Sequence, residues 1–339
     1  MLMSAQTQQR SKKSLFFFFA SHRESGIFLV IVVLVILVTL RAPVFLTTGN
    51  IRDIGMDISA LLIVAIAQTM VIITAGIDLS VASTLALCAM TVGTTVRDHP
   101  TVPLLLVVFL GIALGALLGS LNGAFVTLGK VPPIIVTLGT MSMYRGLVFV
   151  MSGGSWVGAS DVTEDFVALA WTKILGIPTL IIFAVLTALM FSYVMKYTRT
   201  GRQIYAIGSN LTAAQISGFR VERTQFLVYI LSGALAGFAG VLWASRFSVV
   251  QNNSALGFEL QSVASAVVGG TSIYGGSGTI LGTVLGALFI GILANALTLV
   301  HISEFWQLAV QGLVILGAVI INALIARRLQ HIISSRNMH

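Results

Sequence analysis

KYTRTGRQIYAIGSNLTAAQISGFRVERTQ, residues Lys196 to Gln225, is the longest polar and charged run between two apolar segments of this chain. Its basic residues are Lys196, Arg199, Arg202, Arg220 and Arg223, against the single acidic residue Glu222. In its centre, Asn210 favours a helix N-cap, the residues from Leu211 to Ser217 favour about two helical turns, and Gly218 suits the position after a helix end. So short a helix is not stable alone in water, because nucleation costs more than a few hydrogen bonds return. We therefore expect it to dock against a partner.

Composition places the rest of the chain in a membrane. Hydrophobic residues make up 57% of the 339 residues and charged residues 9%, and the mean hydropathy is +0.99. A soluble domain usually carries about 25% charged residues, so this chain has too few charges to cover a water-facing surface. The net charge of +8 does not indicate nucleic acid, because the basic residues cluster at both ends and in residues 196–223, as the positive-inside rule predicts.

Apolar length divides the chain into about nine clear spans of roughly 20 residues. They are expected at Ile27–Phe45, Met56–Ala75, Leu79–Val96, Val102–Leu128, Pro132–Met151, Ile174–Met195, Phe226–Ala244, Ile280–Val300 and Trp306–Ala326. Both terminal tails are basic and should be cytoplasmic, which requires an even number of crossings. The Gly- and Ser-rich apolar run Leu260–Tyr274 is expected to supply the missing crossing as a short or broken span.

The predicted fold is therefore an all-α membrane protein with about ten transmembrane helices and one short or broken span near residues 260–274. Residues 1–26 are expected to form a cytoplasmic N-terminal tail, and residues 327–339 a cytoplasmic C-terminal tail. Residues 27–326 form a single transmembrane domain whose cytoplasmic loop is 196–225. The basic start before an apolar run is typical of a signal peptide, but the sequence after the run is a poor cleavage site, so the first span is expected to stay.

The segment Gly76-Ile-Asp-Leu-Ser80 lies between the second and third spans. An acidic residue embedded in a membrane is costly and usually functional, so Asp78 could form a gate or an essential turn of a translocation path. Alternatively, Asp78 is a simple N-cap of the third span, with Gly76 ending the second. The segment alone supports both interpretations equally.

Residues 270–277, GTSIYGGS, nearly spell a phosphate-binding loop, but Gly276 stands where that loop needs its lysine. We therefore reject nucleotide binding here. Gly269, Gly270, Gly275 and Gly276 are expected instead to permit a tight re-entrant turn between two spans. The sequence contains no pattern typical of a metal site, a nucleophile triad or a pair of catalytic carboxylates, so we expect neither a catalytic residue nor a cofactor in this chain.

Other polar and glycine patterns have two interpretations each. Arg145 could be a pore-lining donor, but we favour the interpretation that it lies near the outer end of its span and reaches the surface. The polar loop Gln251–Glu259 could meet an external partner or be a solvated loop. Glycines repeat every four residues and predict a smooth helix ridge, used either for sliding or for static close packing. These glycines are Gly111, Gly115, Gly119 and Gly123, with the pairs Gly233/Gly237 and Gly282/Gly286.

Four stretches make the chain resemble the permease subunits of bacterial ATP-binding-cassette importers of the ribose/monosaccharide type, which include the autoinducer-2 permeases. The stretches are AGIDLSVAS (Ala75–Ser83), KVPPIIVTLGTMSMYRGL (Lys130–Leu147), TGRQIYAIGSNLTAAQISGFRV (Thr200–Val221) and FELQSVASAVVGGTSIYGGSGTILGTVLGAL (Phe258–Leu288). The resemblance runs from the first span to the last. It departs from the family at Ala75 and Ala82, where the family's GGIDLSVGS has glycines.

The resemblance implies how such a chain works. Two permease subunits, identical or related, would form the path for a monosaccharide or similar polyhydroxylated solute in the bacterial inner membrane. A separate ATPase subunit would bind ATP and Mg²⁺, and a periplasmic or extracellular binding protein would deliver the solute. Asn210 to Gly218 would be the coupling helix that docks on the ATPase, through Asn210, Ala213, Ala214 and Gly218. Asp78, Ser80, Arg145 and Glu259 are the expected residues of the translocation path or gate.

Two other functions remain open at this point. A branched-chain amino-acid permease of the same importer class is one, although the Gly76–Ser80 segment favours the sugar branch. An ion-coupled secondary transporter is the other, but that class often has embedded acidic residues in several spans, and here Asp78 is the only serious candidate.

Overall fold

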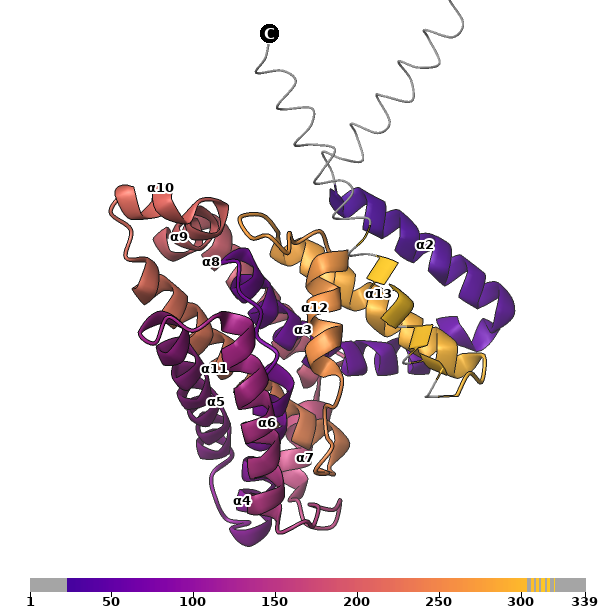
Figure 1. The fold of residues 1–339 in the computed structure, drawn as a ribbon. Coiled ribbons are helices and arrows are strands. Elements are labelled where there is room, and N and C mark those ends of the chain that lie inside the picture. The colour runs from indigo at the N-terminus through magenta and orange to yellow at the C-terminus, as the bar shows by residue number, and fades with distance from the viewer. Residues whose placement is uncertain are drawn as a thin grey trace, which may run out of the picture.

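The computed structural model describes residues 23–303 and short runs between residues 306 and 320. Among these residues, helices form nearly all the regular structure. The strands are β1 (Lys173–Ile174) and β2 (Ile177–Pro178), which pair in a short hairpin, and an isolated antiparallel bridge joins Val157 and Val250. This is the predicted all-α architecture (Figure 1). Most of the tail 1–26, most of the predicted span Trp306–Ala326 and the tail 327–339 lie outside the described residues.

The helices follow the apolar runs of the sequence. They are α2 (Arg23–Arg41), η1 (Pro43–Leu46), α3 (Thr48–Ile73), α4 (Val81–Asp98), α5 (Leu104–Thr127), α6 (Pro133–Ser152), α7 (Glu164–Trp171), α8 (Thr179–Tyr197), α9 (Arg199–Ser209), α10 (Leu211–Ile216), α11 (Val221–Phe247), α12 (Phe258–Val268) and α13 (Ile280–Leu299). Seven of these described helices, α2, α3, α5, α6, α8, α11 and α13, are long and apolar enough to cross a membrane. The chain is a multi-pass membrane protein.

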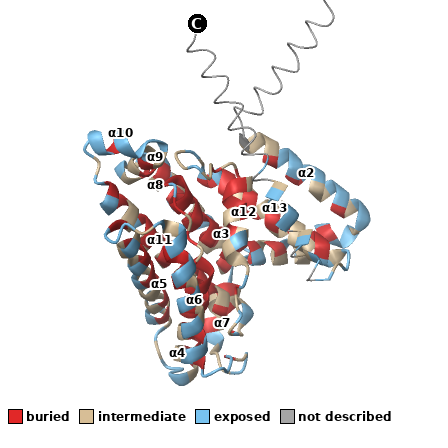
Figure 2. Cartoon of the chain, viewed as in Figure 1, coloured by how far each residue is buried: buried red, intermediate tan, exposed pale blue. Residues whose placement is uncertain are grey.

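Helix α3 lies at the centre of the bundle. In its apolar 18-residue stretch, 94% of the residues are buried, against 17% in the corresponding stretch of α2. Helix α3 contacts α8, α11, α12 and α13. A helix that is apolar on all sides is expected to be buried by its neighbours, and Figure 2 shows the red of buried residues concentrated along α3 and the adjoining part of α11. Helix α2 packs beside α13 at the edge and exposes most of its apolar side chains.

The predicted glycine ridge is a helix–helix contact. Glycines of α5 face Gly233 and Gly237 of α11 so closely that a Cβ on Gly115 would lie 2.8 Å from Gly237 Cα, and a Cβ on Gly119 3.0 Å from Gly233 Cα. In the same way, Gly282 and Gly286 of α13 leave no room for a Cβ against the backbone of α12. In this conformation the ridge serves close packing.

One predicted span is short, as expected, and another begins later than predicted. The run Leu260–Tyr274 is helical only as far as Val268, and an eleven-residue helix is about 16 Å long, roughly half the hydrocarbon thickness of a bilayer. The predicted start of the sixth span at Ile174 is wrong, because residues 173–178 form the β1–β2 hairpin and α8 begins at Thr179. The hairpin turn uses positive φ angles at Leu175 and Gly176.

Candidate functional site

The short helix predicted in the charged stretch is present as α10. The Asn210 side chain accepts a hydrogen bond from the Ala213 N–H at 2.9 Å, as an N-cap does. At the other end, Gly218 has a φ of +79°, which lets the chain turn after the last helical residues. Both predicted caps therefore fix the ends of this helix.

Helix α10 buries one side and exposes the other. Ala214 is buried in one apolar cluster with Ile207 of α9 and Val221 of α11. In contrast, Ile216 is 84% exposed and Leu211 47% exposed, and Ala213 is exposed as well. Figure 2 shows α10 at an outer corner of the bundle, mostly in the blue of exposed residues. Two apolar side chains on so small an exposed helix form a surface suited to a partner.

Sequence analysis missed the helix that carries α10. Helix α9 begins with Thr198 as its N-cap, whose hydroxyl accepts from Gly201 N at 3.1 Å. It buries Ile204 and Ile207 and exposes Arg199 and Arg202. The amphipathic spacing and the capping threonine were available in the sequence, but the high charge of the stretch resembled a loop.

The end of α9 meets the end of α3 and the glycine loop after α12 at a single point. The Gly276 N–H donates to the Ile73 carbonyl at 2.9 Å. Gly208 lies against both groups, because a Cβ there would overlap the Ile73 oxygen and lie 2.6 Å from Gly276 N. Next to them, the Tyr205 hydroxyl donates to the Gly278 carbonyl at 2.7 Å. We call this contact of Ile73, Gly208 and Gly276 the three-way junction.

The glycine loop reaches the junction through turns that require glycine. Gly270, Gly275 and Gly276 have φ angles of +93°, +86° and +72°, a region that residues with a Cβ rarely adopt. Gly269 has an ordinary φ, and its role is contact, since a Cβ there would overlap the Gly282 carbonyl. The predicted tight turn is therefore present between α12 and α13, and it packs on the end of α9.

Five residues beyond Ile73, Asp78 lies in the break between α3 and α4 and is 2% exposed. Its Oδ1 accepts from the Ser80 backbone N–H at 3.0 Å and from the Ser80 hydroxyl at 2.6 Å. Its Oδ2 accepts from the Ser232 hydroxyl of α11 at 3.1 Å. The N-cap position of α4 is Ser80. Asp78 therefore fixes the turn before the helix and ties it to α11, which is more than a simple N-cap does.

Neighbouring amides extend this buried polar cluster to α5 and back to α3. The Asn122 amide of α5 donates to the Ser80 hydroxyl at 2.7 Å. The Gln68 side chain, oriented to satisfy both groups, donates to the Asp78 carbonyl at 3.0 Å and accepts from the Asp78 N–H at 3.3 Å. Gly76 also packs here, since a Cβ on it would lie 2.9 Å from the Tyr229 hydroxyl. The break thus joins four helices through polar contacts.

Arg145 and Glu259 belong to a different part of the molecule. Arg145 is half-buried and donates to the carbonyl oxygens of Asn252 and Ser254, at 3.3 and 2.8 Å, so it holds the loop between α11 and α12. Whether it also reaches the membrane surface or lines the path stays a prediction. Glu259, half-buried in the first turn of α12, acts electrostatically on Arg145.

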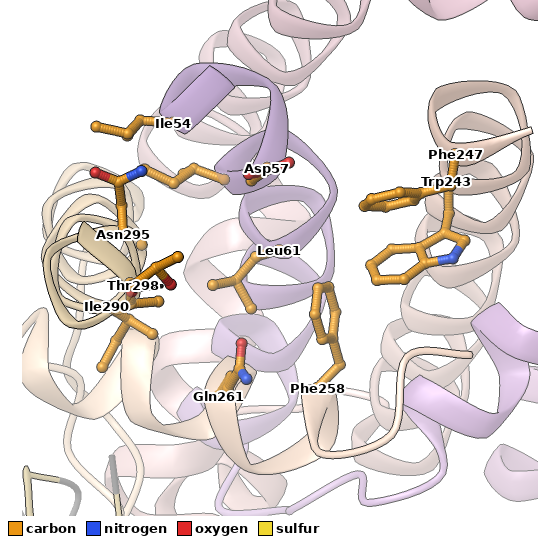
Figure 3. Close-up of a pocket in the computed structure, with 13 residues that line it drawn as sticks. Ile54, Asp57, Leu61, Trp243, Phe247, Phe258, Gln261, Ile290, Asn295 and Thr298 are labelled. Carbon is orange, nitrogen blue, oxygen red and sulfur yellow. Dashed lines mark hydrogen bonds between the residues drawn. The ribbon is translucent and has the colours of Figure 1, made fainter. Parts of the chain in front are cut away.

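A pocket of about 280 Å³ opens between α3, α11, α12 and α13 (Figure 3). Its lining combines aromatic rings with amide, hydroxyl and carboxylate side chains. The residues are Ile54, Asp57, Ile58, Leu61, Trp243, Phe247, Phe258, Gln261, Ile290, Gly291, Ala294, Asn295 and Thr298. Sequence analysis missed this pocket, because its residues come from four segments far apart in the chain, each of which looks like an ordinary span.

Comparisons with known proteins agree with this architecture. The model of the family described as "Branched-chain amino acid transport system / permease component" matches residues 50–319. The chain is 39% identical to the "Ribose import permease protein RbsC" of Haemophilus influenzae, over 84% of this chain and 88% of that protein. It is 36% identical to the "D-allose transport system permease protein AlsC" of Escherichia coli, over 86% and 89%. It is 33% identical to the "Autoinducer 2 import system permease protein LsrC" of an Enterobacter strain, over 85% and 82%.

No solved structure matches the chain. The family match covers most of the chain, including α10, the three-way junction, the Asp78 cluster and the pocket, and the relatives align over nearly their whole lengths. The chain therefore belongs to the family of permease components of the branched-chain amino acid transport type, which includes the ribose, allose and autoinducer-2 import permeases.

Proposed function

We propose that this chain is the membrane permease of an ATP-binding-cassette importer for a monosaccharide or a similar small polyhydroxylated solute. The similarity to ribose and allose permeases supports the sugar class. ATP and Mg²⁺ bind to a separate ATPase subunit, a second permease subunit completes the path, and a substrate-binding protein delivers the solute from outside.

The observation that carries the proposal is α10, a helix capped at both ends that exposes Leu211 and Ile216 and buries Ala214. A partner that binds the segment from Asn210 to Gly218 therefore contacts a rigid helix and not a flexible loop. Movement of α10 acts on α9, because the two helices are joined at Asn210 and pack through Ile207. From α9 it passes through the three-way junction to α3 and to the α12–α13 turn.

The Asp78 cluster is the element that such movement would act on. Asp78 and Ser80 lie in the chain break that follows directly after the junction, and their contacts reach α5 and α11. We assign them to the gate of the translocation path. Arg145 and Glu259 are assigned to its outer part, where Arg145 holds the loop before α12 and Glu259 acts on Arg145 through its charge.

The same scheme fixes the proposed topology. Helix α10, the N-terminal residues 1–26 and the C-terminal residues 327–339 are cytoplasmic, and residues 27–326 form one domain with about ten crossings of the bacterial inner membrane. The short helix α12 with its glycine loop counts as one broken crossing, buried among other helices.

Reconstitution tests this function. The chain is assembled with its cognate ATPase and binding protein in liposomes, and uptake of radiolabelled D-ribose and D-allose is measured with and without ATP. We expect uptake of one of these sugars only with ATP, and its loss in Ile216→Glu, which places a charge on the docking surface. Uptake driven by a proton gradient without ATP would indicate a secondary transporter, and uptake of leucine in place of sugar would indicate the amino-acid branch.

A further inference from the structure

The pocket shown in Figure 3 is lined by the end of α11 that is far from α10. Helix α11 begins three residues after Gly218, and its pocket residues Trp243 and Phe247 lie near its other end. A helix of 27 residues is about 40 Å long, enough to cross a bilayer. Helix α3 gives the same orientation, because its first turns line the pocket and its last residue, Ile73, lies at the three-way junction.

Aromatic rings form one side of the pocket. Trp243 lies 4.9 Å from Phe258 at a right angle and 4.5 Å from Phe247, measured between ring centroids. Figure 3 shows Trp243 and Phe247 on one side of the pocket and Asn295 and Thr298 on the opposite side, with Leu61 of α3 between them. A rigid cluster of rings provides an apolar face, on which the C–H face of a sugar ring can stack.

Polar groups on the other sides are held in place by neighbours outside the pocket. Asp57 Oδ1 is bound by Arg246 at 3.2 Å, yet the Asp57 side chain is 57% exposed. Asn295 and Asn50 form a reciprocal pair of amide hydrogen bonds at 2.9 and 3.1 Å. Each amide nitrogen carries two N–H groups, so an amide fixed in this way still has donor capacity. These groups are oriented before any ligand arrives, which lowers the cost of binding.

We propose that this pocket is the site where the permease first holds its solute, a single monosaccharide, before the path opens toward the cytoplasm. This inference rests on the proposed function, because only an importer receives solute at the end opposite its ATPase. About 280 Å³ is at the lower limit of ligand pockets, which suits one sugar ring and no oligosaccharide. Rings on one side with an amide, a hydroxyl and a carboxylate on the others match the apolar face and hydroxyl rim of such a molecule.

A lipid chain is the competing occupant, since the pocket lies among membrane helices. Its lining argues for the sugar. A site for an acyl chain has no use for the Asp57 carboxylate or for the amides of Gln261 and Asn295, whose burial beside hydrocarbon would be costly.

Two variants in the complete importer test the site by transport. Thr298→Val and Gln261→Leu remove pocket polarity with little change of volume, and we expect each to lower uptake at saturating loaded binding protein about tenfold, with ATP hydrolysis retained. Thr187→Val is the control for loss of a helix hydroxyl. Like Thr298, Thr187 donates its hydroxyl to a carbonyl one turn back in its own helix, but it is buried and does not line the pocket, whereas the exposed Thr298 also accepts from the Gln307 side-chain amide at 3.3 Å. Full uptake by both pocket variants would overturn the inference.

Chemical labelling tests binding directly and does not need transport. In a Cys88→Ala background, Thr298→Cys is labelled from outside with a membrane-impermeant maleimide, in the presence of whichever of D-ribose and D-allose the wild-type complex imports. We expect that sugar to slow labelling several-fold and leucine to have no effect. Leu175→Cys is the control, because Leu175 is 98% exposed in the β1–β2 hairpin, and its labelling should not respond to sugar.

The outcomes separate the two proposals. Labelling of Thr298→Cys that sugar does not slow, or a lipid that co-purifies and blocks the label, overturns the pocket as a sugar site and leaves the importer function standing. A wild-type complex that imports leucine and neither sugar overturns the sugar class itself, and the inference falls with it. If Thr298→Val and Gln261→Leu fail to assemble, the labelling result alone decides.

Discussion

Gly208 lies directly against the Ile73 carbonyl oxygen, so a methyl group at residue 208 would overlap that oxygen. One residue belongs to α9 and the other ends α3, and Gly276 donates its N–H to the same oxygen. The helix that carries α10 is thus in backbone contact with the central helix of the bundle, without a side chain between them. Backbone groups in contact transmit displacement with little compliance, because packed interiors are dense.

Gly208→Ala should therefore uncouple transport from ATP hydrolysis. The added methyl group must push α9 away from α3, and overpacking of this kind costs about 1–3 kcal/mol. We expect uptake into proteoliposomes to fall at least about tenfold, with the ATPase subunit still bound. Gly139→Ala on α6 is the control, because a Cβ there meets nothing within 4 Å. Equal uptake by the two variants would contradict a role for the junction.

Asn210→Ala should lower the affinity of the permease for the ATPase subunit. Loss of an N-cap side chain costs about 1 kcal/mol of helix stability, and a helix as short as α10 has little stability of its own. We expect an affinity for the isolated ATPase subunit that is lower by about fivefold, measured by titration in nanodiscs.

The control for Asn210→Ala is Thr163→Ala. Thr163 caps α7 with the same geometry, accepting from the Phe166 N–H at 3.4 Å, but α7 is far along the chain from α10. If both variants bind the ATPase equally well, α10 is not the contact.

Asp78→Asn should destabilise the purified permease. The carboxylate accepts from the Ser80 N–H, the Ser80 hydroxyl and the Ser232 hydroxyl, whereas an amide replaces one acceptor with a donor. The amide oxygen can keep both Ser80 contacts while its NH2 donates to the Ser232 hydroxyl, which rotates to accept. The cost arises because hydrogen bonds to a charged group are worth about 1.5–3 kcal/mol, against about 0.5–1.5 kcal/mol for neutral ones. Thermal unfolding in detergent measures the loss. Asp161→Asn, at a half-buried loop carboxylate that accepts from Gly158 N, should cost less, and the reverse order would contradict this account.

Local features of the sequence predicted local structure well. Asn210 and Gly218 predicted both ends of α10, since caps depend on the residue itself. The repeated glycines of α5 predicted a close helix contact. They did not predict that Gly233 and Gly237 would be the partners, because the pairing of helices depends on the whole fold and not on the local sequence. The pocket was not predictable for the same reason. Trp243 and Asn295 look like ordinary residues of two spans until the fold places them on opposite sides of one cavity (Figure 3).

Ala75 offers a prediction in which a substitution stabilises the protein. Ala75 has a φ of +62°, a left-handed conformation that costs a residue with a Cβ about 1–2 kcal/mol. Glycine avoids that cost but loses more backbone entropy on folding, about 0.5–1 kcal/mol, so Ala75→Gly should raise the free energy of unfolding by up to about 1 kcal/mol.

Ala82→Gly restores the other glycine of the resembling motif, yet Ala82 lies in the first turn of α4 and is fully buried. There glycine brings only the entropy loss and a small cavity, so stability should fall by about 1 kcal/mol. Thermal unfolding of the two variants should shift in opposite directions. A downward shift in both would mean that the left-handed turn before Asp78 is not strained.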